Sequence, residues 1–194
     1  CLVLLTGCAT LQEGRAVWVV RYRLAEPAAL GKIVGDAKRN NMNTLFVQVH
    51  GRADAYYDSE IEPRSEVLKG HPKDYDPLKE ILQRGHAAGL EVHAWVNAYY
   101  AWNRPPPLPV SPEHVVNRRP DWLITDDEEH RIDRYSREEM ARRWVEGFYL
   151  DPARKEVREY LVEVSSEIVR KYRVDGIHLD FIRYPGSGFG FNPQ

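Results

Sequence analysis

The stretch VDGIHLDFIRYP, residues 174–185, places two ionisable side chains inside a run that is otherwise apolar. His178 and Asp180 are two residues apart, so in a strand they share one face. A carboxylate at the end of a buried strand is costly unless it is hydrogen-bonded or takes part in chemistry, and acid–base or nucleophilic catalysis is chemistry that a carboxylate can perform. Asp180 is therefore the candidate catalytic residue. Arg183 and Tyr184 follow closely enough to orient it or to bind a substrate.

Two structural alternatives remain open for this segment. Asp180 could form an ion pair with Arg183 and serve only stability. His178, one layer deeper, could be a core histidine that supports Asp180 or a neighbour by a hydrogen bond. Neither alternative removes Asp180 from the end of the strand, where a substrate would meet it.

The elements that must position these residues alternate between short β-branched or aromatic runs and longer segments of helical periodicity. The second helix has Asp76 as its N-cap, Pro77 in its first turn and Gly89 after its end. The βαβαβαβ order implies parallel strands joined by right-handed crossovers. We predict strands over residues 16–21, 44–50, 91–97 and 176–182, and helices over residues 27–41, 77–88 and 152–172.

In three of these strands, one face is aliphatic and the other becomes polar toward the carboxyl end. An open doubly wound sheet buries both faces in aliphatic side chains, whereas a TIM (β/α)8 barrel opens onto an active site at the carboxyl ends of its strands. The pattern therefore favours the barrel. The polar faces carry three pairs of candidate site residues: Gln48 with His50, Trp95 with Asn97, and His178 with Asp180.

Four βα units fill about half of such a barrel, which typically needs about 250 residues. We therefore interpret residues 14–194 as an incomplete α/β domain, the N-terminal portion of a TIM barrel. Two long connections, residues 51–75 and 98–150, follow the second and third strands and lie on the side where barrels place function. Within the second, DWLITDDEEHRI is predicted to form a small hairpin.

Glycoside hydrolysis fits these features, because it commonly uses two carboxyl groups around an oxocarbenium-like transition state. Asp54 or Asp151 could supply the second carboxylate from the loops, although a residue outside this chain is the leading expectation. Asp151 is most simply the N-cap of the last helix. Further candidate substrate-binding residues are Arg52, Asp54, Tyr99 and Asp151. Aromatic side chains that could line the rim are Tyr56, Tyr57, Tyr99, Tyr100, Trp102 and Trp122.

A metal-dependent barrel hydrolase is the alternative enzyme class. His50, His93, His178 and Asp180 fall on the polar strand faces, where a metallohydrolase holds its ligands. Their depths along the strands are unequal, however, and no strand carries a His-x-His pair. We therefore predict no metal and no cofactor.

The N-terminal residues CLVLLTGCAT form an apolar run too short to span a bilayer, as in the core of a signal peptide. Leu5-Thr6-Gly7-Cys8 resembles a bacterial lipobox, which predicts lipidation of Cys8 and anchoring to a membrane of the cell envelope. We assign residues 1–13 to this partial signal and a linker. The formal net charge of −2 provides no basic field, so nucleic acid is not an expected partner.

Several segments, in order, resemble the bacterial glycosyl-hydrolase-like family 10 domain: RAVWVVR, FVQVHGRADAYYDSEIEPRSEVLKG, DYDPLKEILQRGHAAGLEVHAWVN, PDWL and YLDPARKEVREYLVEVSSEIVRKYRVDGIHLDFIRYP. The resemblance runs from about residue 15 to residue 185. It implies a TIM barrel, frequent lipoproteins, and a catalytic Asp at the position of Asp180. The family includes an enzyme that digests peptide-free peptidoglycan strands.

The sequence departs from the family pattern at two strand ends. HAWVNAYYAW stands where Asn-Pro-Tyr-Arg is commoner, and His50-Gly51 where Arg-Pro is frequent. These changes leave the identity of the substrate open. We predict a secreted lipoprotein glycoside hydrolase acting on a polysaccharide, with peptidoglycan glycan strands as the leading substrate. A non-catalytic glycan-binding lipoprotein is the remaining alternative.

Overall fold

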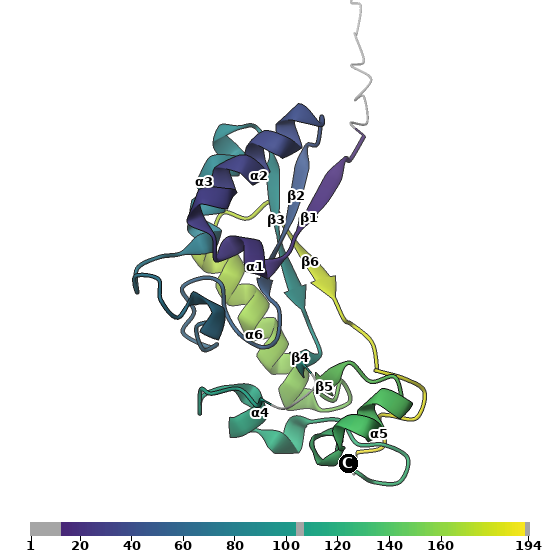
Figure 1. The fold of residues 1–194 in the computed structure, drawn as a ribbon. Coiled ribbons are helices and arrows are strands. Elements are labelled where there is room, and N and C mark those ends of the chain that lie inside the picture. Colours follow the sequence, from purple (N-terminus) through teal and green to yellow (C-terminus); the bar gives the residue numbers. More distant parts are fainter. Residues whose placement is uncertain (1–12, 104–106, 193–194) are drawn as a thin grey trace, which may run out of the picture.

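A computed structural model describes residues 13–103 and 107–192 of the chain. Its centre is a parallel sheet whose four strands keep their order in the sequence, with the first and last at the edges (Figure 1). The strands are β1 (Ala16–Val19), β2 (Thr44–His50), β3 (Glu91–Asn97) and β6 (Gly176–Asp180). Strand number, order and direction agree with the predicted portion of a (β/α)8 barrel.

Three helices link successive strands and lie on one side of the sheet (Figure 1): α2 (Pro27–Arg39), α3 (Pro77–Ala87) and α6 (Lys155–Lys171). Each buries one apolar stripe, and full burial of one such Leu or Ile side chain stabilises by about 1.5–3 kcal/mol. Asp76 caps α3 by accepting a hydrogen bond from Lys79 N at 3.0 Å, as predicted. The buried stripes include Leu30, Val34 and Ala37 of α2, Leu78, Ile81 and Leu82 of α3, and Val157, Val164 and Ile168 of α6.

The two faces of the sheet differ as the alternation of residues predicts. The aliphatic face is sealed along β2 and β3, where Leu45, Val47, Val49, Val92, Ala94 and Val96 are at most 1% exposed, but not along β6, where Leu179 is 49% exposed. The opposite face is aromatic and more open. There the ring of Phe46 stacks on that of His178 at 4.6 Å between centroids and lies 5.1 Å from that of Trp18, which is 54% exposed. This open face corresponds to the interior of a barrel.

The alternation fails at the end of β2. Gln48 pairs with Trp95 and His50 pairs with Val96, so β2 has one extra residue, Val49, between two consecutive pairs with β3. Such a bulge re-aims the side chains that follow it. His50 therefore does not continue the face of Phe46 and Gln48, and that part of the prediction is wrong.

The long connections are folded. The first contains the 3-10 turn η1 (Glu66–Leu68), and the second contains an antiparallel pair, β4 (Tyr100–Asn103) with β5 (Gly147–Tyr149). The predicted hairpin is present, because Thr125 bridges Arg131 and Asp126 N donates to His130 O at 3.0 Å. Shorter elements of the second connection are α4 (Val115–Arg118), η2 (Pro120–Trp122), η3 (Ile132–Arg134) and α5 (Arg137–Arg142).

Several predicted boundaries are wrong, including the end of α2, which lies at Arg39 rather than at residue 41. The first strand ends at Val19, and Arg21 begins a short helix, α1 (Arg21–Leu24). The last strand ends at Asp180 rather than at residue 182. Asp151 is not the N-cap of α6, since that position belongs to Arg154. Among the described residues, no helix combines the length and hydropathy needed to cross a bilayer. The predicted lipidation at Cys8 lies outside the described residues.

Candidate functional site

Asp180 ends β6 with a carboxylate held by two N–H donors. Its Oδ2 accepts a hydrogen bond from the Trp95 indole Nε1 at 3.1 Å, and its Oδ1 accepts one from Phe181 N at 2.7 Å. The side chain is partly exposed. Hydrogen bonds from N–H groups stabilise an ionised carboxylate and fix its orientation. Asp180 is thus presented as an oriented, accessible carboxylate at a strand end, where a barrel places its chemistry.

The residue after Asp180 has a left-handed backbone. Phe181 has φ of 51°, which is an outlier for a bulky side chain. This turn aims the Phe181 N–H at the Asp180 carboxylate. The ring lies 4.8 Å from that of Tyr100, so packing helps to hold the turn. Backbone outliers of this kind concentrate at functional sites, which supports the assignment of Asp180.

Gln48 and Asn97 form a polar chain beside Asp180. Asn97 pairs with Asp180 across the sheet, and its side-chain oxygen lies 3.4 Å from Gln48 Nε2. Gln48 Oε1 accepts hydrogen bonds from the backbone N and Nη1 of Arg21 at 3.3 and 3.1 Å. Both amides are nearly fully buried, so they are placed to orient neighbouring groups. Asn97 Nδ2 completes the chain by donating to Gly51 O at 3.0 Å.

His50 belongs to a separate buried group. Its Nδ1 lies 3.0 Å from Asn97 O and its Nε2 lies 2.9 Å from Glu62 Oε1, while the Tyr160 hydroxyl donates to the same Glu62 oxygen. Burial lowers the pKa of His50, but the hydrogen bond and charge of Glu62 outweigh it and raise the pKa. Both ring nitrogens face acceptor oxygens, an arrangement that favours the form protonated on both nitrogens, in the same direction as the raised pKa. At 1% exposure, His50 supports the Asn97 backbone and offers no free atom to a substrate.

Arg52 and Asp54 satisfy one another inside the first long loop. Asp54 accepts hydrogen bonds from Arg52 N at 3.1 Å and from the Ser65 hydroxyl at 2.7 Å. The Arg52 guanidinium lies 4.0 Å above the Trp102 ring and donates to Asn103 at 2.8 Å. Asp54 is 3% exposed. These contacts stabilise the conformation of the loop. Asp54 therefore lacks the exposure that a second catalytic carboxylate needs.

Tyr99, Asp151 and Tyr184 come together at a second position along the rim. Tyr99 N donates to Phe181 O, and Leu150 N donates to Tyr99 O, which brings the residues before Asp151 beside the end of β6. Burial raises the pKa of the Tyr184 phenol, and the nearby Asp151 and Tyr99 add to that rise. Asp151 is 1% exposed, and its Oδ2 meets no hydrogen-bond donor among the described residues.

Arg183 is paired, but not with Asp180. Its Nη2 donates to Glu146 Oε1 at 2.5 Å, and its guanidinium lies 5.1 Å from the Phe181 ring centroid. The structural alternative of an Asp180–Arg183 ion pair is therefore wrong. Arg183 instead ties the segment after β6 to the turn between α5 and β5.

The predicted rim of aromatic side chains is mostly core. Tyr56, Tyr57, Tyr100, Trp102 and Trp122 are all at most 8% exposed. Only Tyr99 of that set is partly exposed. These aromatic side chains pack in the space between the loops and the helices. The sequence alone does not distinguish an aromatic residue that packs in this way from one that binds a ligand.

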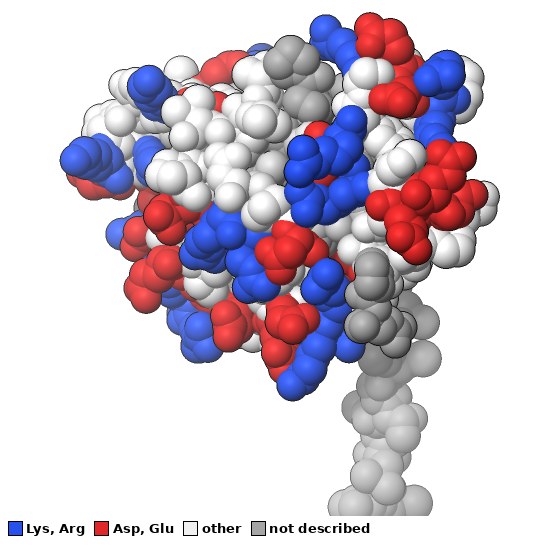
Figure 2. All heavy atoms as spheres, turned by 90° about the horizontal axis from the view of Figure 1, so that it is seen from below, with Lys and Arg blue, Asp and Glu red and all other residues white. Residues whose placement is uncertain are grey.

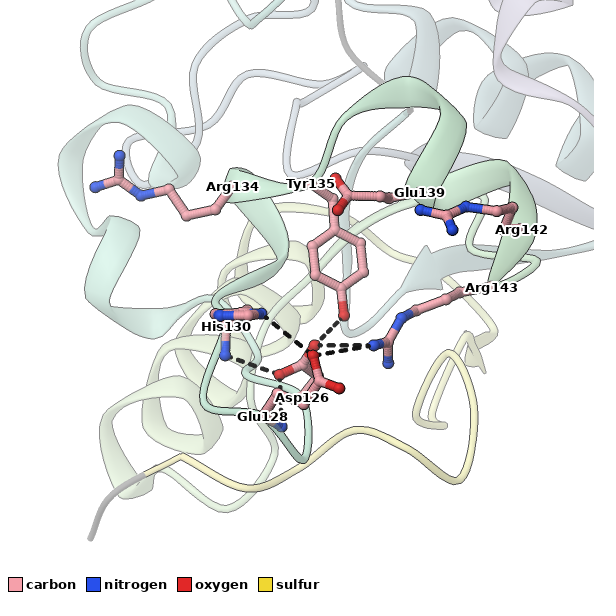
Figure 3. Close-up of a pocket in the computed structure, with 8 residues that line it drawn as sticks. All are labelled: Asp126, Glu128, His130, Arg134, Tyr135, Glu139, Arg142 and Arg143. Carbon is pink, nitrogen blue, oxygen red and sulfur yellow. Dashed lines mark hydrogen bonds and ion pairs between the residues drawn. The ribbon is translucent and has the colours of Figure 1, made fainter.

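The histidines of the alternative metal site do not converge. Within residues 13–103 and 107–192, the only three-residue group with ligand atoms close enough to share a metal ion is Asp126, Glu128 and His130 of the hairpin. These three belong to a cavity of about 520 Å³ lined only by residues 126–143 (Figure 3). Asp126 is already engaged there by His130 N at 2.8 Å and by the Tyr135 hydroxyl, and Arg143 lies 3.6 Å away. These contacts stabilise the hairpin, and the carboxylate of Asp126 is already occupied by them.

Four residues of the site were missed by sequence reasoning. Arg21 was placed at the end of a strand, and Glu62, Glu146 and Phe181 were not singled out. Arg21 could have been noticed as a charged residue at a predicted strand end. The roles of the other three depend on contacts between distant segments, which no local pattern reveals.

Figure 2 shows the molecule from below, the side on which α4, α5, β4 and β5 lie in Figure 1, and this face mixes basic and acidic side chains around an uncharged area. This face has no extended field of one sign.

Comparisons with known proteins agree with this geometry. The family model described as Glycosyl hydrolase-like 10 matches residues 13–194. Among curated relatives, glycosyl hydrolase YngK of Bacillus subtilis is 30% identical over 190 residues, covering 90% of this chain and 34% of the relative. Glycosyl hydrolase DigH of Escherichia coli K12 is 29% identical over 187 residues, covering 89% and 38%. The chain therefore spans little more than a third of the relatives it matches.

Solved structures support the fold. A hypothetical protein from Ruminiclostridium thermocellum matches with a TM-score of 0.64 at 18% identity, covering 91% of this chain and 81% of that one. An α-L-fucosidase isoenzyme from Paenibacillus thiaminolyticus matches with a TM-score of 0.61 at 18% identity, covering 93% and 25%. From its residues, its partial barrel and these matches, the chain belongs to the Glycosyl hydrolase-like 10 family.

Proposed function

We propose that this protein hydrolyses glycosidic bonds and that Asp180 is its catalytic carboxylate. The observation that carries the proposal is the presentation of Asp180: partly exposed, at the end of a barrel strand, with each oxygen accepting an N–H hydrogen bond at 3.1 or 2.7 Å. Membership of a glycosyl-hydrolase-like family supports the reaction class.

Within this reaction, Asp180 suits the role of nucleophile or electrostatic stabiliser better than that of general acid. A general acid must donate a proton from one of its oxygens, whereas both oxygens of Asp180 accept hydrogen bonds from N–H donors, the arrangement that suits an oriented nucleophile. Trp95 and Phe181 would hold the carboxylate toward the anomeric carbon, while Asn97 and Gln48 would fix the strand end around it. The reaction then also needs a group that protonates the leaving oxygen.

The partner carboxylate is expected from outside the described residues. Asp54 is held by Arg52 and Ser65, and Asp151 is 1% exposed. The open aromatic face around Trp18 and Phe46 has the character of a barrel interior that further strands would complete. The small share of each curated relative that this chain covers fits this expectation.

The leading substrate is the glycan strand of peptidoglycan, which we infer from the family resemblance. The test is to incubate the full-length protein with peptide-free peptidoglycan strands, chitin and cellulose and to measure the release of reducing ends. Release from peptidoglycan strands above that from the other two supports the substrate. Release only from chitin or cellulose would replace it, and release from none would overturn hydrolysis.

Glycan binding without cleavage is the second candidate, because Asp180 is the only one of the three candidate carboxylates that is more than 3% exposed. A pull-down with the same insoluble polysaccharides, run beside the reducing-end assay, separates the two. Binding without reducing ends favours a binding protein.

We also propose that Cys8 is lipidated and anchors the protein to the cell envelope. The support is Leu5-Thr6-Gly7-Cys8 after an apolar run. Metabolic labelling with a palmitate analogue should label the wild-type protein and not the Cys8→Ser variant. Equal labelling of both would contradict the anchor.

A further inference from the structure

Trp144 is the most exposed large apolar residue of the described chain. Its side chain is 87% exposed, against 54% for Trp18 on the open face of the sheet. In the described part of the chain, its indole makes no hydrogen bond and no ring contact. Large apolar side chains exposed to this degree cost solubility and add nothing to the core. Packing therefore gives no reason for a tryptophan here.

The backbone gives no reason either. Trp144 follows the C-cap of α5, Arg143, and has φ of 56°. Its N–H bonds Ala141 O at 3.2 Å and the N–H of Val145 bonds Met140 O at 2.8 Å, which is the Schellman arrangement at a helix end. Glycine is the preferred residue at this left-handed position, and a bulky residue is disfavoured. Tryptophan thus occupies a position that favours glycine.

Trp144 is held at the same end of the molecule as Asp180. It is followed by Val145, which is fully buried, and by Glu146, which bonds Arg183 at 2.5 Å. Arg183 lies three residues after Asp180. Beyond Glu146, the Tyr149 ring lies 6.2 Å from that of Phe181, the residue whose N–H holds Asp180. Contacts of Glu146 and Tyr149 therefore hold the turn that contains Trp144 against the segment that follows Asp180.

We infer that Trp144 is a stacking platform for a pyranose ring of the glycan, at a subsite beyond the bond that is cleaved. This inference rests on the proposed function. The face of an aromatic ring carries negative charge density and receives the polarised C–H groups on the flat face of a sugar. The exposed indole provides that surface, and only two side-chain torsions have to be ordered on binding. A pyranose therefore accounts for both the exposure and the strained backbone.

The test compares three variants of the full-length protein on peptide-free peptidoglycan strands. Trp144→Gly should raise KM about tenfold while retaining kcat, which is within the range that aromatic ring contacts contribute. Its Tm should stay the same or rise, because glycine relieves the left-handed backbone. Trp144→Phe keeps a ring and should restore most of the affinity. Val110 is another exposed apolar residue of the second long connection, residues 98–150, and its side chain is 77% exposed. Val110→Gly should leave KM unchanged.

The outcomes separate this inference from the proposed function. If the wild type releases reducing ends and Trp144→Gly has the same KM, the stacking platform is wrong while hydrolysis stands. A marked fall in Tm for Trp144→Gly would mean that the ring packs against another part of the protein, which also overturns the platform. If the wild type neither cleaves nor binds any of the polysaccharides, the proposed function fails, and the platform with it.

Discussion

The indole of Trp95 donates a hydrogen bond of 3.1 Å to the carboxylate of Asp180 from the neighbouring strand. The two residues are not opposite one another: Trp95 pairs with His178, and Asp180 pairs with Asn97. The Trp95 indole extends from the level of His178 toward the carboxyl end of the strands, where its Nε1 reaches the shorter side chain of Asp180. A tryptophan in the interior of a barrel thus becomes a polar support for the candidate catalytic residue.

Removing this donor should reduce catalysis more than stability. Trp95→Phe keeps a ring in place but loses the N–H, and a hydrogen bond to a charged group contributes about 1.5–3 kcal/mol. We expect kcat to fall by about tenfold to a hundredfold, with KM little changed. Steady-state kinetics and thermal unfolding of the variant measure this. Unchanged kcat would show that Trp95 does not orient Asp180.

Gly51 leaves room for the side chain of Arg21. A Cβ at this position would lie 2.4 Å from Arg21 Cδ and 2.9 Å from its Nε. Gly51→Ala should therefore displace Arg21 from Gln48 and lower the free energy of unfolding by about 0.5–1.5 kcal/mol, the net contribution of a hydrogen bond. Gly14→Ala, where nothing lies within 4 Å, is the matched control. Denaturant unfolding of both variants tests this, and equal stabilities would refute the steric argument.

The His50–Glu62 pair should make stability depend on pH. Glu62 raises the pKa of His50 above its ordinary value of 6.5, so the pair contributes its full stability below pH 6.5. This contribution is lost as the pH rises through the raised pKa. Glu62→Gln should be less stable than the wild type by about 2 kcal/mol below that pH, with the difference shrinking above it. Parallel pH profiles of Tm for both proteins would contradict the assignment.

Chelation distinguishes the carboxylate mechanism from a metal-dependent one. The strand-end histidines do not form a shared site in the described residues, and Arg143 lies within 3.7 Å of two members of the hairpin group. We expect treatment with EDTA to leave the rate of glycan cleavage unchanged. Loss of activity that is restored by zinc would favour the metal-dependent class instead.

The sequence predicts β2 and β3 to the residue, because alternation and the flanking turn residues mark both ends of each strand. It does not predict the bulge that redirects His50, since bulges leave no clear signature in a single strand. Nor does it predict that Phe181 adopts φ of 51°, a conformation that its residue type disfavours. Such local conflicts arise where tertiary contacts override local preference, as they do at functional sites.

The candidate site was predicted in part for the same reason. Gln48, Asn97, Trp95 and Asp180 were found from strand parity alone, and the structure brings them together. Asp54 and most of the loop aromatics were misplaced, because loop residues have no periodicity that separates buried from exposed positions. The partners of His50 and Arg183 depend on segments far apart in the chain, which parity cannot bring together.

The most direct test of the account is the turnover of Asp180→Asn in the full-length protein. Asparagine keeps the shape of the side chain and an acceptor for one of the two N–H donors, so the fold and glycan binding should be retained. We expect the release of reducing ends to fall by about 10²- to 10⁴-fold, since a positioned catalytic group contributes that much. Turnover at the wild-type rate would contradict the central claim that Asp180 performs the chemistry.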